Sequence, residues 1–378
     1  MAGFSASLVG IGLARFAYTP LLPAIIDAGW FETSNATYLG AANLAGYLIG
    51  ALSAGWIVKK SSTASALRSM MLLASIAFFA CAFPLSYLWF FVWRLFSGIA
   101  GGALMVLAAP AVLAQVPASK RGMAGGIIFM GVGVGVAASG TLVPLLLQLG
   151  LRQTWIGLGL ISLLFTAIAW GGWPGQVKTQ GNATGRKRQP ANIRLRALYI
   201  EYALNAVGWV PHMIFLVAFV ARGMGQGVDV GSQYWVLFGI GATLGPLLAG
   251  VLADKVGFGP ALRLSLILDA VSVSIPALGV STPWLMASSV VVGAFVTGTV
   301  PLVLGRVHEL LAHHPAQQGS AWRTATVGFA LTQAVGAYGL SYLFSSSDSN
   351  YAMLFLIGAG AIALALLVNL VATVLKTR

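Results

Sequence analysis

Long apolar stretches alternate with short polar segments along the whole chain. Runs of roughly 17–25 mainly apolar residues are long enough to cross a bilayer as a helix. Inside lipid, each run must satisfy its own backbone hydrogen bonds, so each is predicted to be α-helical. The pattern therefore predicts an all-α polytopic membrane protein with twelve transmembrane helices, near residues 3–27, 37–58, 68–86, 88–116, 122–148, 154–173, 197–221, 233–253, 261–281, 284–305, 321–344 and 351–375.

The composition agrees with this class. Of the 378 residues, 58% are hydrophobic and 8% are charged, against about 25% charged residues in soluble domains. The first span lacks a basic n-region and a small-residue cleavage site, so we expect a retained helix rather than a signal peptide. The single cysteine, Cys81, excludes an intrachain disulfide and is expected to be a small buried apolar residue.

The net charge of +13 raises the question of a nucleic-acid partner. With the N-terminus inside, seventeen basic residues fall on the cytoplasmic side, and only Arg152 and Arg222 fall outside. This is a strong positive-inside bias, which predicts that both termini are cytoplasmic. The charge is thus explained by topology and by membrane lipids, without nucleic acid. The other two basic residues, Arg15 and Arg94, lie inside predicted spans.

One polar segment divides the chain. Residues 174–196 are rich in Gly, Pro, Asn and Gln, hold six basic residues and no acid, and separate six spans from six. We expect a cytoplasmic linker attracted to anionic headgroups. It would join an N-terminal six-helix bundle, residues 1–173, to a C-terminal six-helix bundle, residues 197–378.

The two halves contain an internal repeat. Residues 46–68 align without a gap to residues 241–263, with nine identities at an offset of 195. Repeated glycines in these segments allow helices to approach closely. Parallel six-helix repeats are the architecture of one class of secondary transporter, with the substrate site at the membrane midplane between the halves. The repeat predicts two pseudo-symmetric six-helix bundles.

Three motifs extend this into a family resemblance. The segment GVLADKVG, residues 250–257, resembles the loop signature of the major facilitator superfamily, and RLFSGIAGG, residues 94–102, is similar to its second motif. The opening GLARFAYTPLLPAI, residues 12–25, resembles the YbfB/YjiJ branch. The resemblance covers the whole chain. It implies a secondary transporter that works by alternating access, in a bacterial inner membrane, and we expect a monomer.

The chain departs from the superfamily pattern in three places. Lys59 stands where the first-half loop motif usually has an aspartate. The fifth span, 122–148, carries several glycines but lacks the glycine–proline pair typical of proton-driven drug antiporters. The core of the first span contains no acid, which some proton-coupled relatives keep there.

Arg15 and Arg94 are the first candidate site residues. The resemblance implies that the first and fourth spans line the cavity, and a charge at this depth is usually functional. A guanidinium offers a planar fork that matches a carboxylate or phosphate. Alternatively, carbonyls and polar neighbours hold Arg15 as a link within the bundle. The family motif associates Arg94 with coupling and with helix packing.

Other polar side chains extend the candidate substrate site. Tyr18 and Thr19 follow Arg15 by three and four positions and share its helical face, and an i, i+4 polar pair occurs in the second span. These residues either face the substrate or bridge helices. The further candidates for substrate contact are Asn43, Tyr47, Trp209 and His212.

Two residues of the second half are candidates for proton coupling. His212 belongs to a residue type that titrates near neutral pH, and Glu201 lies about one turn from the cytoplasmic end of its span. The alternatives are a hydrogen bond within the bundle for His212 and a helix-end acid near the linker arginines for Glu201.

The loop motif also implies a gate. A glycine at position 250 would let its helix close on a neighbour, and the Asp254 carboxylate would then cap a helix N-terminus. A helix predicted to begin near Ser320 is the expected partner. The gating candidates are Gly250, Asp254, Lys255, Gly257 and Arg323.

Enzyme chemistry is not expected. His308 and His313 in HELLAH are five positions apart, whereas a zinc-protease helix needs a spacing of four to place both imidazoles on one face, so no metal site is predicted. The chain has no G-x-S-x-G, no paired aspartates and no glycine-rich nucleotide loop, and no cofactor is predicted.

These observations favour transport of a small solute. An organic anion is the preferred substrate class, because both deep charges of the first half are positive, and proton coupling through His212 or Glu201 is a further hypothesis. Two alternatives stay open: a proton-driven exporter of drug-like compounds, and a receptor or assembly partner that moves nothing.

Overall fold

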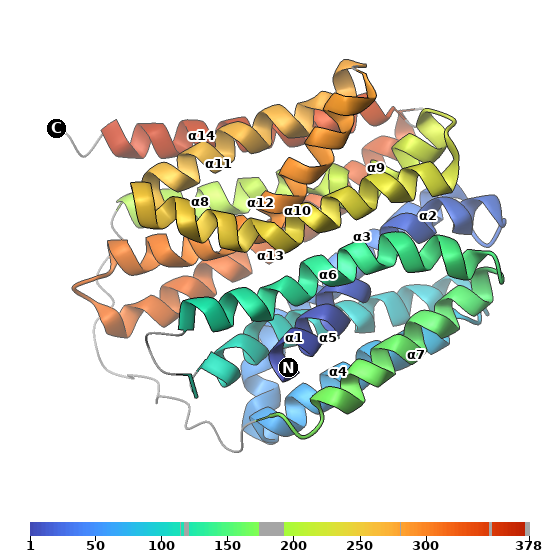
Figure 1. The fold of residues 1–378 in the computed structure, drawn as a ribbon, viewed down its shortest axis with the longest axis horizontal. Helices are drawn as coiled ribbons and strands as arrows, with labels where there is room; N and C mark the ends of the chain where they lie inside the picture. The colour runs from blue at the N-terminus through green and yellow to red at the C-terminus, as the bar shows by residue number, and fades with distance from the viewer. Residues whose placement is uncertain (114, 117–120, 174–192, 280, 348–349, 375–378) are drawn as a thin grey trace.

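The computed structural model describes residues 1–113, 115–116, 121–173, 193–279, 281–347 and 350–374. Most of the predicted linker, residues 174–192, lies outside this set. The last four linker positions, 193–196, already belong to a helix. All regular structure in the described residues is helical, and most helices run along the long axis of the molecule, horizontal in Figure 1.

Twelve helical segments are long and apolar enough to cross a membrane, which confirms the prediction from the apolar pattern. The first half contains α1 (Ala2–Ser7), the π-helical η1 (Leu8–Leu13), α2 (Tyr18–Asp27), α3 (Thr33–Lys60), α4 (Thr63–Cys81), α5 (Tyr87–Leu113), α6 (Arg121–Leu147) and α7 (Leu151–Ala169). The second half contains α8 (Ile193–Gly208), η3 (Pro211–Phe215), α9 (Leu216–Ala218), η4 (Phe219–Gly223), α10 (Gly227–Val256), α11 (Phe258–Ser274), η5 (Ile275–Leu278), α12 (Thr282–Leu310), α13 (Pro315–Ser346) and α14 (Tyr351–Val374).

Several helices extend beyond their predicted spans. The spans predicted at 233–253 and 321–344 are helical over Gly227–Val256 and Pro315–Ser346. Apolar runs indicate where hydrocarbon begins, whereas a helix continues until its backbone is capped. Helix ends in the headgroup region are polar, so hydropathy does not detect them.

The internal repeat reappears in the contacts between helices. A Cβ atom on Gly50 of α3 would collide with the carbonyl oxygen of Ile99 in α5, and 195 positions later Gly245 of α10 has the same relation to Ala294 of α12. Such backbone-to-backbone approach needs a residue without a side chain. The other matched pairs are Gly46 with Leu95 and Gly241 with Val290, and Gly98 with Asn43 and Gly293 with Phe238. Each half is therefore built around the same glycine-mediated helix pair.

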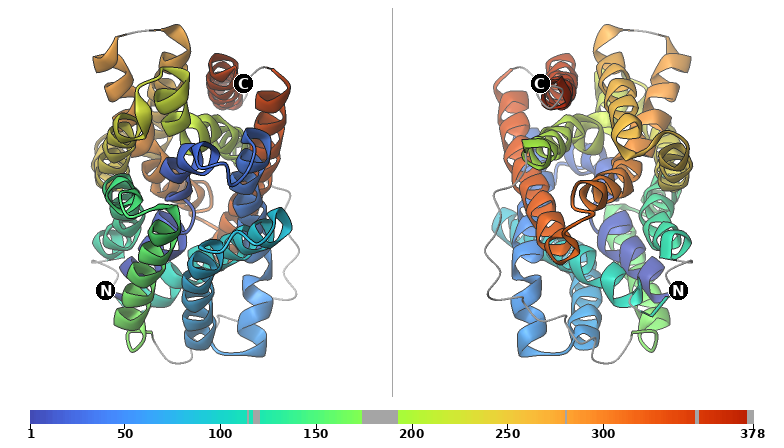
Figure 2. Two further views of the ribbon diagram at one scale, coloured as in Figure 1. Left: turned by 90° about the vertical axis from the view of Figure 1, so that its right-hand side faces the viewer. Right: turned by 90° about the vertical axis from the view of Figure 1, so that its left-hand side faces the viewer.

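The bundle has one strongly basic end, viewed face-on in the right panel of Figure 2. This basic end is defined by the described residues Lys59, Lys60, Arg68, Arg194, Arg196, Lys255, Arg263, Arg306 and Arg323. The opposite end carries the helix termini near Asp27, Arg152 and Arg222.

The halves meet along two seams, α6 against α10 and α3 against α13. In the first seam, a Cβ on Gly133 would collide with Thr243, and one on Gly140 would come within 3.0 Å of Val236 N. Nearer the basic end of this seam, Gly250 has open space around its Cβ position. In the second seam, the rings of Tyr38 and Tyr338 stack near the opposite end, whereas a Cβ on Gly55 or Gly319 would find nothing within 4 Å. The first seam is thus tight at Gly133 and Gly140 and open at Gly250, nearer the basic end, and the second holds a ring contact near the opposite end.

Two glycines of α3 give a matched test of this packing. We expect Gly50→Ala to lower the free energy of unfolding by about 1–3 kcal/mol, because the methyl group has to displace the backbone of α5. Gly55→Ala, on the same helix but facing open space, should be neutral or stabilising by up to about 1 kcal/mol, because alanine favours the helix. Melting temperatures of both variants in detergent measure the difference. Equal destabilisation by the two would contradict the close α3–α5 contact.

Candidate functional site

Two membrane-spanning segments are interrupted at corresponding places. In the first, the π-helical η1 gives way to a turn at residues 14–17 before α2 begins. In the second half, α8 ends at Gly208 and the π-helical η3 begins at Pro211, whose missing N–H prevents a regular helix. Interrupted helices free backbone groups in the membrane, and π-helical turns are frequent at functional sites. Arg15 lies within the first interruption.

At this interruption, the carbonyl oxygen of Ala14 accepts hydrogen bonds from three side chains. Arg94 Nη1 donates to it at 3.0 Å, Ser97 Oγ at 3.2 Å and Asn43 Nδ2 at 3.4 Å. The Arg94 guanidinium also lies 4.4 Å from the centre of the Tyr18 ring. These contacts satisfy a backbone group that water cannot reach. The structure therefore places Arg94, Asn43 and Tyr18 behind the wall of the central cavity, holding the first span in its interrupted form.

A central cavity lies between the halves, lined by residues of both. Arg15 is the only charged side chain among the residues that line it. Most of the other lining side chains are aromatic or apolar. The wall consists of Ile11, Arg15, Phe16, Tyr47, Met105, Phe129, Val132, Tyr202, Trp209, Met213, Val296, Thr297, Val300, Trp322, Thr326, Phe329 and Gln333. Three of the predicted substrate contacts, Arg15, Tyr47 and Trp209, are thus brought together on one wall.

Neutral groups hold the Arg15 guanidinium. Its Nη2 donates to the side-chain oxygen of Gln333 in α13 and lies 3.8 Å from the sulfur of Met213. Its central carbon lies 5.1 Å from the centre of the Tyr47 ring, within cation–π range. Neither of the two ion pairs shown between described residues, Arg222–Asp27 and Arg306–Glu309, includes Arg15. The guanidinium is therefore positioned without a compensating negative charge.

Thr19 connects the halves rather than lining the cavity. Its hydroxyl donates to the carbonyl oxygen of Met213, which joins α2 to η3. Farther out, Arg222 pairs with Asp27 at 3.7 Å between η4 and α2. That pair is partly exposed and contributes little by itself. Together with the stacked tyrosines of the second seam, these contacts close the cavity toward the opposite end.

His212 points away from the cavity. It is fully buried, and its Nε2 lies 3.1 Å from the hydroxyl of Ser288 in α12. Ser288 gives its own proton to the carbonyl oxygen of Ser272, 2.6 Å away, so His212 Nε2 is the donor to Ser288. The other ring nitrogen, Nδ1, has no hydrogen-bond partner in the structure. The predicted substrate contact at His212 is thus located on the far side of η3.

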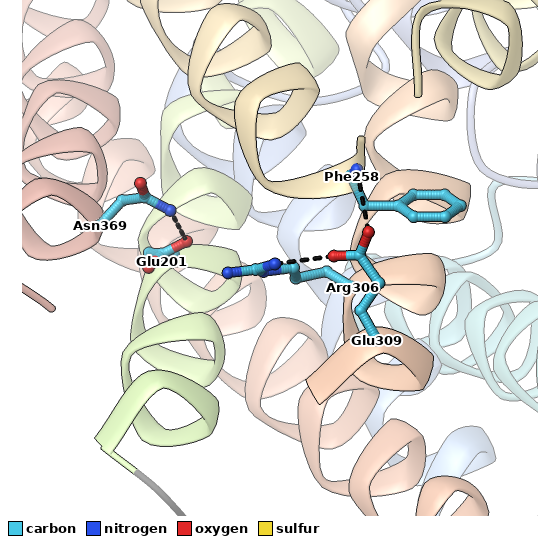
Figure 3. Close-up of polar contacts among 5 residues, drawn as sticks. All are labelled: Glu201, Phe258, Arg306, Glu309 and Asn369. Atoms are coloured by element: carbon cyan, nitrogen blue, oxygen red, sulfur yellow. Dashed lines mark hydrogen bonds and ion pairs between the residues drawn. The ribbon is translucent and has the colours of Figure 1, made fainter. Parts of the chain in front are cut away.

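Glu201 belongs to a polar network at the basic end (Figure 3). Its Oε2 accepts a hydrogen bond from Asn369 of α14 at 2.9 Å. The Arg306 side chain extends toward it from the adjacent α12 and pairs with Glu309 at 2.7 Å. Glu309 in turn accepts the backbone N–H of Phe258, at the first turn of α11, at 3.3 Å. The network joins α8, α11, α12 and α14, and Glu201 does not line the cavity.

The predicted gating residues lie at the basic end, where Gly250 has open space beside it. Asp254, Lys255 and Arg323 are exposed, and the ion pairs shown between described residues do not include them. Gly257 adopts a φ of 83°, which requires glycine at the turn into α11. The helix expected near Ser320 begins earlier, at Pro315, and its first turn has no side-chain cap.

Sequence reasoning missed most of the cavity wall. Gln333 is the one residue that carried a usable signal, since an amide within an apolar span seldom faces lipid. The sequence does not single out the aromatic wall residues Tyr202, Trp322 and Phe329, because aromatic side chains are common throughout this chain. Asp269, an acid within the predicted span 261–281, has no motif around it that assigns it a role.

Paired six-helix halves, matching interrupted helices and a central cavity define a secondary transporter of the major facilitator fold. Its chemistry is that of a carrier and not of an enzyme. A family model described as "Uncharacterised MFS-type transporter YbfB" matches residues 7–370. The chain belongs to this family, which confirms the resemblance found in the sequence motifs.

Individual proteins give a consistent picture. The inner membrane transport protein YdhP of Escherichia coli K12 is 25% identical over 354 residues, covering 89% of this chain and 88% of YdhP. The crystal structure of a D-xylose–proton symporter matches with a TM-score of 0.74 at 15% identity, over 97% of this chain and 95% of the symporter. The xylose transporter XylE of E. coli, in a partially occluded inward-open conformation, also matches with a TM-score of 0.74 at 15% identity, over 97% of this chain and 96% of XylE. At this identity the two solved structures establish the fold alone.

The lone cysteine makes access to the cavity measurable. In Cys81→Ala protein, we expect Met105→Cys, on the cavity wall, to react with a hydrophilic maleimide in detergent, and Thr19→Cys, buried in the closed side, to stay unmodified. Mass spectrometry of the labelled protein gives the two rates. Wild-type Cys81, which is buried, serves as the unreactive control. Faster labelling at position 19 than at position 105 would show that the opposite end is the open one.

Proposed function

We propose that this transporter moves a small organic monoanion with an apolar or aromatic body. The observation that carries the proposal is the lone Arg15 guanidinium on the cavity wall, which faces no acid. Its Nε, moreover, has no hydrogen-bond partner in the structure. A carboxylate or similar group would supply both the missing charge and the missing acceptor, in the planar geometry that a guanidinium favours.

The remaining wall supports the apolar part of this substrate class. Tyr47, Trp209 and Phe329 present ring surfaces, and the polar contribution is limited to groups such as Gln333 and Thr326. In small-molecule sites of this kind, a mostly apolar lining with a few polar groups fixes the orientation of the ligand. Sugars and other polyols would need many more hydrogen-bonding side chains than this wall offers.

The conformation and the charge distribution support a direction of opening. Seventeen basic residues in the sequence would lie on one side, and the positive-inside rule makes that side cytoplasmic, with both termini there, in an inner membrane. On this assignment the structure is inward-facing. We further propose that closure brings Asp254 to the uncapped N-terminus of α13, where a carboxylate is favourable. Gly250 would then provide the close contact that it lacks here.

Proton coupling is a second part of the proposal. A solved transporter of the same fold is a D-xylose–proton symporter. Glu201 and His212 were the candidates from the sequence, and both lie outside the cavity wall. Neither side chain can therefore exchange a proton directly with a substrate in the cavity.

A proton-driven exporter of lipophilic cations is the second candidate function, favoured by the aromatic wall. The two candidates differ in the sign of the ligand charge. A buried guanidinium repels a cation, so the exporter needs Arg15 to be a structural link only.

Ligand-induced stabilisation separates these candidates. We expect benzoate to raise the melting temperature of the wild type, because a ligand at 100 times its dissociation constant adds about 2.7 kcal/mol of stability. Arg15→Gln should abolish this shift, since the glutamine keeps a polar side chain but loses the charge. Differential scanning fluorimetry of the purified protein measures both.

The control is Arg152→Gln, which removes an exposed arginine from the opposite end and should leave the benzoate shift intact. Tetraphenylphosphonium is the cationic probe. Stabilisation by this cation alone, or a benzoate shift that survives Arg15→Gln, would support the exporter and contradict the anion site.

Gln333 provides an independent test. In Gln333→Glu, the new carboxylate would lie where the amide oxygen now accepts from Arg15, and it would occupy the guanidinium. We expect benzoate affinity to fall at least tenfold while the ligand-free melting temperature stays unchanged or rises. Isothermal titration calorimetry gives the affinity. Unchanged benzoate binding in this variant would rule out Arg15 as the anion contact.

A further inference from the structure

An aspartate lies buried behind the cavity wall with no counter-charge. Asp269 occupies the middle of α11, and the residue is 1% exposed. Its Oδ2 accepts the indole N–H of Trp209 at 2.6 Å and, at 3.5 Å, the side-chain amide of Asn205. Neither ion pair between the described residues includes it. An ionised carboxylate in this position would be a buried charge held only by neutral donors, which is costly.

The hydrogen-bond pattern around Asp269 has room for one more hydrogen. Its second oxygen, Oδ1, is buried without a partner, and so is the side-chain oxygen of Asn205. Both atoms are acceptors, and they belong to two side chains that are already in contact. A single proton on Oδ1 would turn that oxygen into a donor, and the Asn205 oxygen is the acceptor without a partner beside it. A proton bound there would supply the hydrogen that this pair of acceptors lacks.

We propose that Asp269 is the proton-binding site of this transporter and that Trp209 links it to the substrate cavity. The proposal rests on the proposed anion transport for its coupling partner. The chemical step is the addition of one proton to the Asp269 carboxylate to give a neutral carboxylic acid, and its removal when the cycle reverses. No other bond is formed or broken.

Other titratable groups on the surrounding helices have their own partners or lie at the ends of the bundle. Glu201 of α8 bonds to Asn369, and His212 of η3 bonds to Ser288. The described part of α14 contains no acid, lysine, arginine or histidine. The remaining charged or titratable acids and bases of these helices lie in the end turns of α10, at both ends of the bundle, and in the basic-end turns of α8, α11 and α12: Arg194, Arg196, Asp229, Asp254, Lys255, Arg263, Arg306, His308 and Glu309. Among these groups, Asp269 is hydrogen-bonded to a residue that lines the cavity, Trp209.

Trp209 forms the physical connection. One edge of its indole donates to Asp269, and its ring lines the cavity beside Phe329, with ring centres 5.5 Å apart. A charged acceptor holds a donor more strongly than a neutral one. Protonation of Asp269 therefore loosens Trp209 and removes a negative charge behind the wall that receives the anion. The anion and the proton each favour binding of the other, which is the linkage of a symporter.

A ligand-free measurement tests the proton site first. Between about pH 5.5 and 8.5, exposed carboxyl groups with pKa values near 4 stay ionised. In this range we expect infrared difference spectra of the wild type to show the carbonyl band of a protonated carboxylic acid, decreasing as the pH rises. Asp269→Asn should lose this band, and Asp229→Asn, which changes an exposed acid of α10, should keep it. A band that persists in Asp269→Asn, or that disappears instead in Glu201→Gln, overturns the proposal.

Benzoate affinity then tests the coupling. By calorimetry, the wild type should bind benzoate at least fivefold more tightly at pH 5.5 than at 8.5, within the usual range of coupling between sites. Asp269→Asn resembles the protonated acid, so it should bind tightly at both pH values. Trp209→Phe, which keeps a ring but loses the donor, should keep the infrared band and lose most of the pH dependence of binding. Wild-type pH dependence in Asp269→Asn overturns the proposal.

The two proposals fail in different ways. Absence of benzoate binding by the wild type, with the infrared band present and lost in Asp269→Asn, counts against the anion substrate and leaves the proton site in place. Benzoate binding that depends on Arg15 but not on pH supports the anion substrate and overturns the role of Asp269.

Discussion

A positive charge inside the membrane without an acid beside it is the constraint on which this structure depends. A cation at this depth costs free energy, so it has to be kept away from lipid and surrounded by polar groups. The protein meets this requirement with Gln333, the sulfur of Met213 and the ring of Tyr47 around Arg15. These residues come from both halves, so the charge also determines where the halves meet.

Placing that charge required a break in the first span. A continuous helix would have used the Ala14 carbonyl internally, whereas here Arg94, Asn43 and Ser97 all donate to it. The second arginine of the membrane core is therefore tied to the backbone next to the first. The two arginines, at similar depth, therefore have different surroundings. Arg15 faces the cavity, and Arg94 supports the segment that carries Arg15.

The sequence predicted the architecture well because membrane helices and internal repeats leave long-range patterns. Glycines that recur at an offset of 195 predicted paired halves, and the structure shows the corresponding helix contacts at the same offset. The site was harder to predict. Which face of a span points inward depends on helix rotation and on local breaks, and neither Gly208 nor Pro211 reveals that His212 turns toward Ser288. Aromatic wall residues such as Phe329 look like any lipid-facing residue in the sequence. The gating residues inferred from the loop motif, and the coupling candidates Glu201 and His212, remain predictions.

The neutral partner of Arg15 has an electrical consequence. A carrier that pairs its central cation with glutamine keeps one positive charge at that site when empty, and it is locally neutral when a monoanion is bound. Moving one elementary charge through the full field of a membrane involves about 2.3 kcal/mol per 100 mV. In the proposed cycle, ionised Asp269 offsets the charge of Arg15 in the empty carrier, and the bound anion offsets it when Asp269 is protonated. Membrane voltage would therefore act on the forms that carry only one of the two ligands. Gln333, an uncharged amide, thereby leaves the charge balance of the proposed cycle to the substrate and to Asp269.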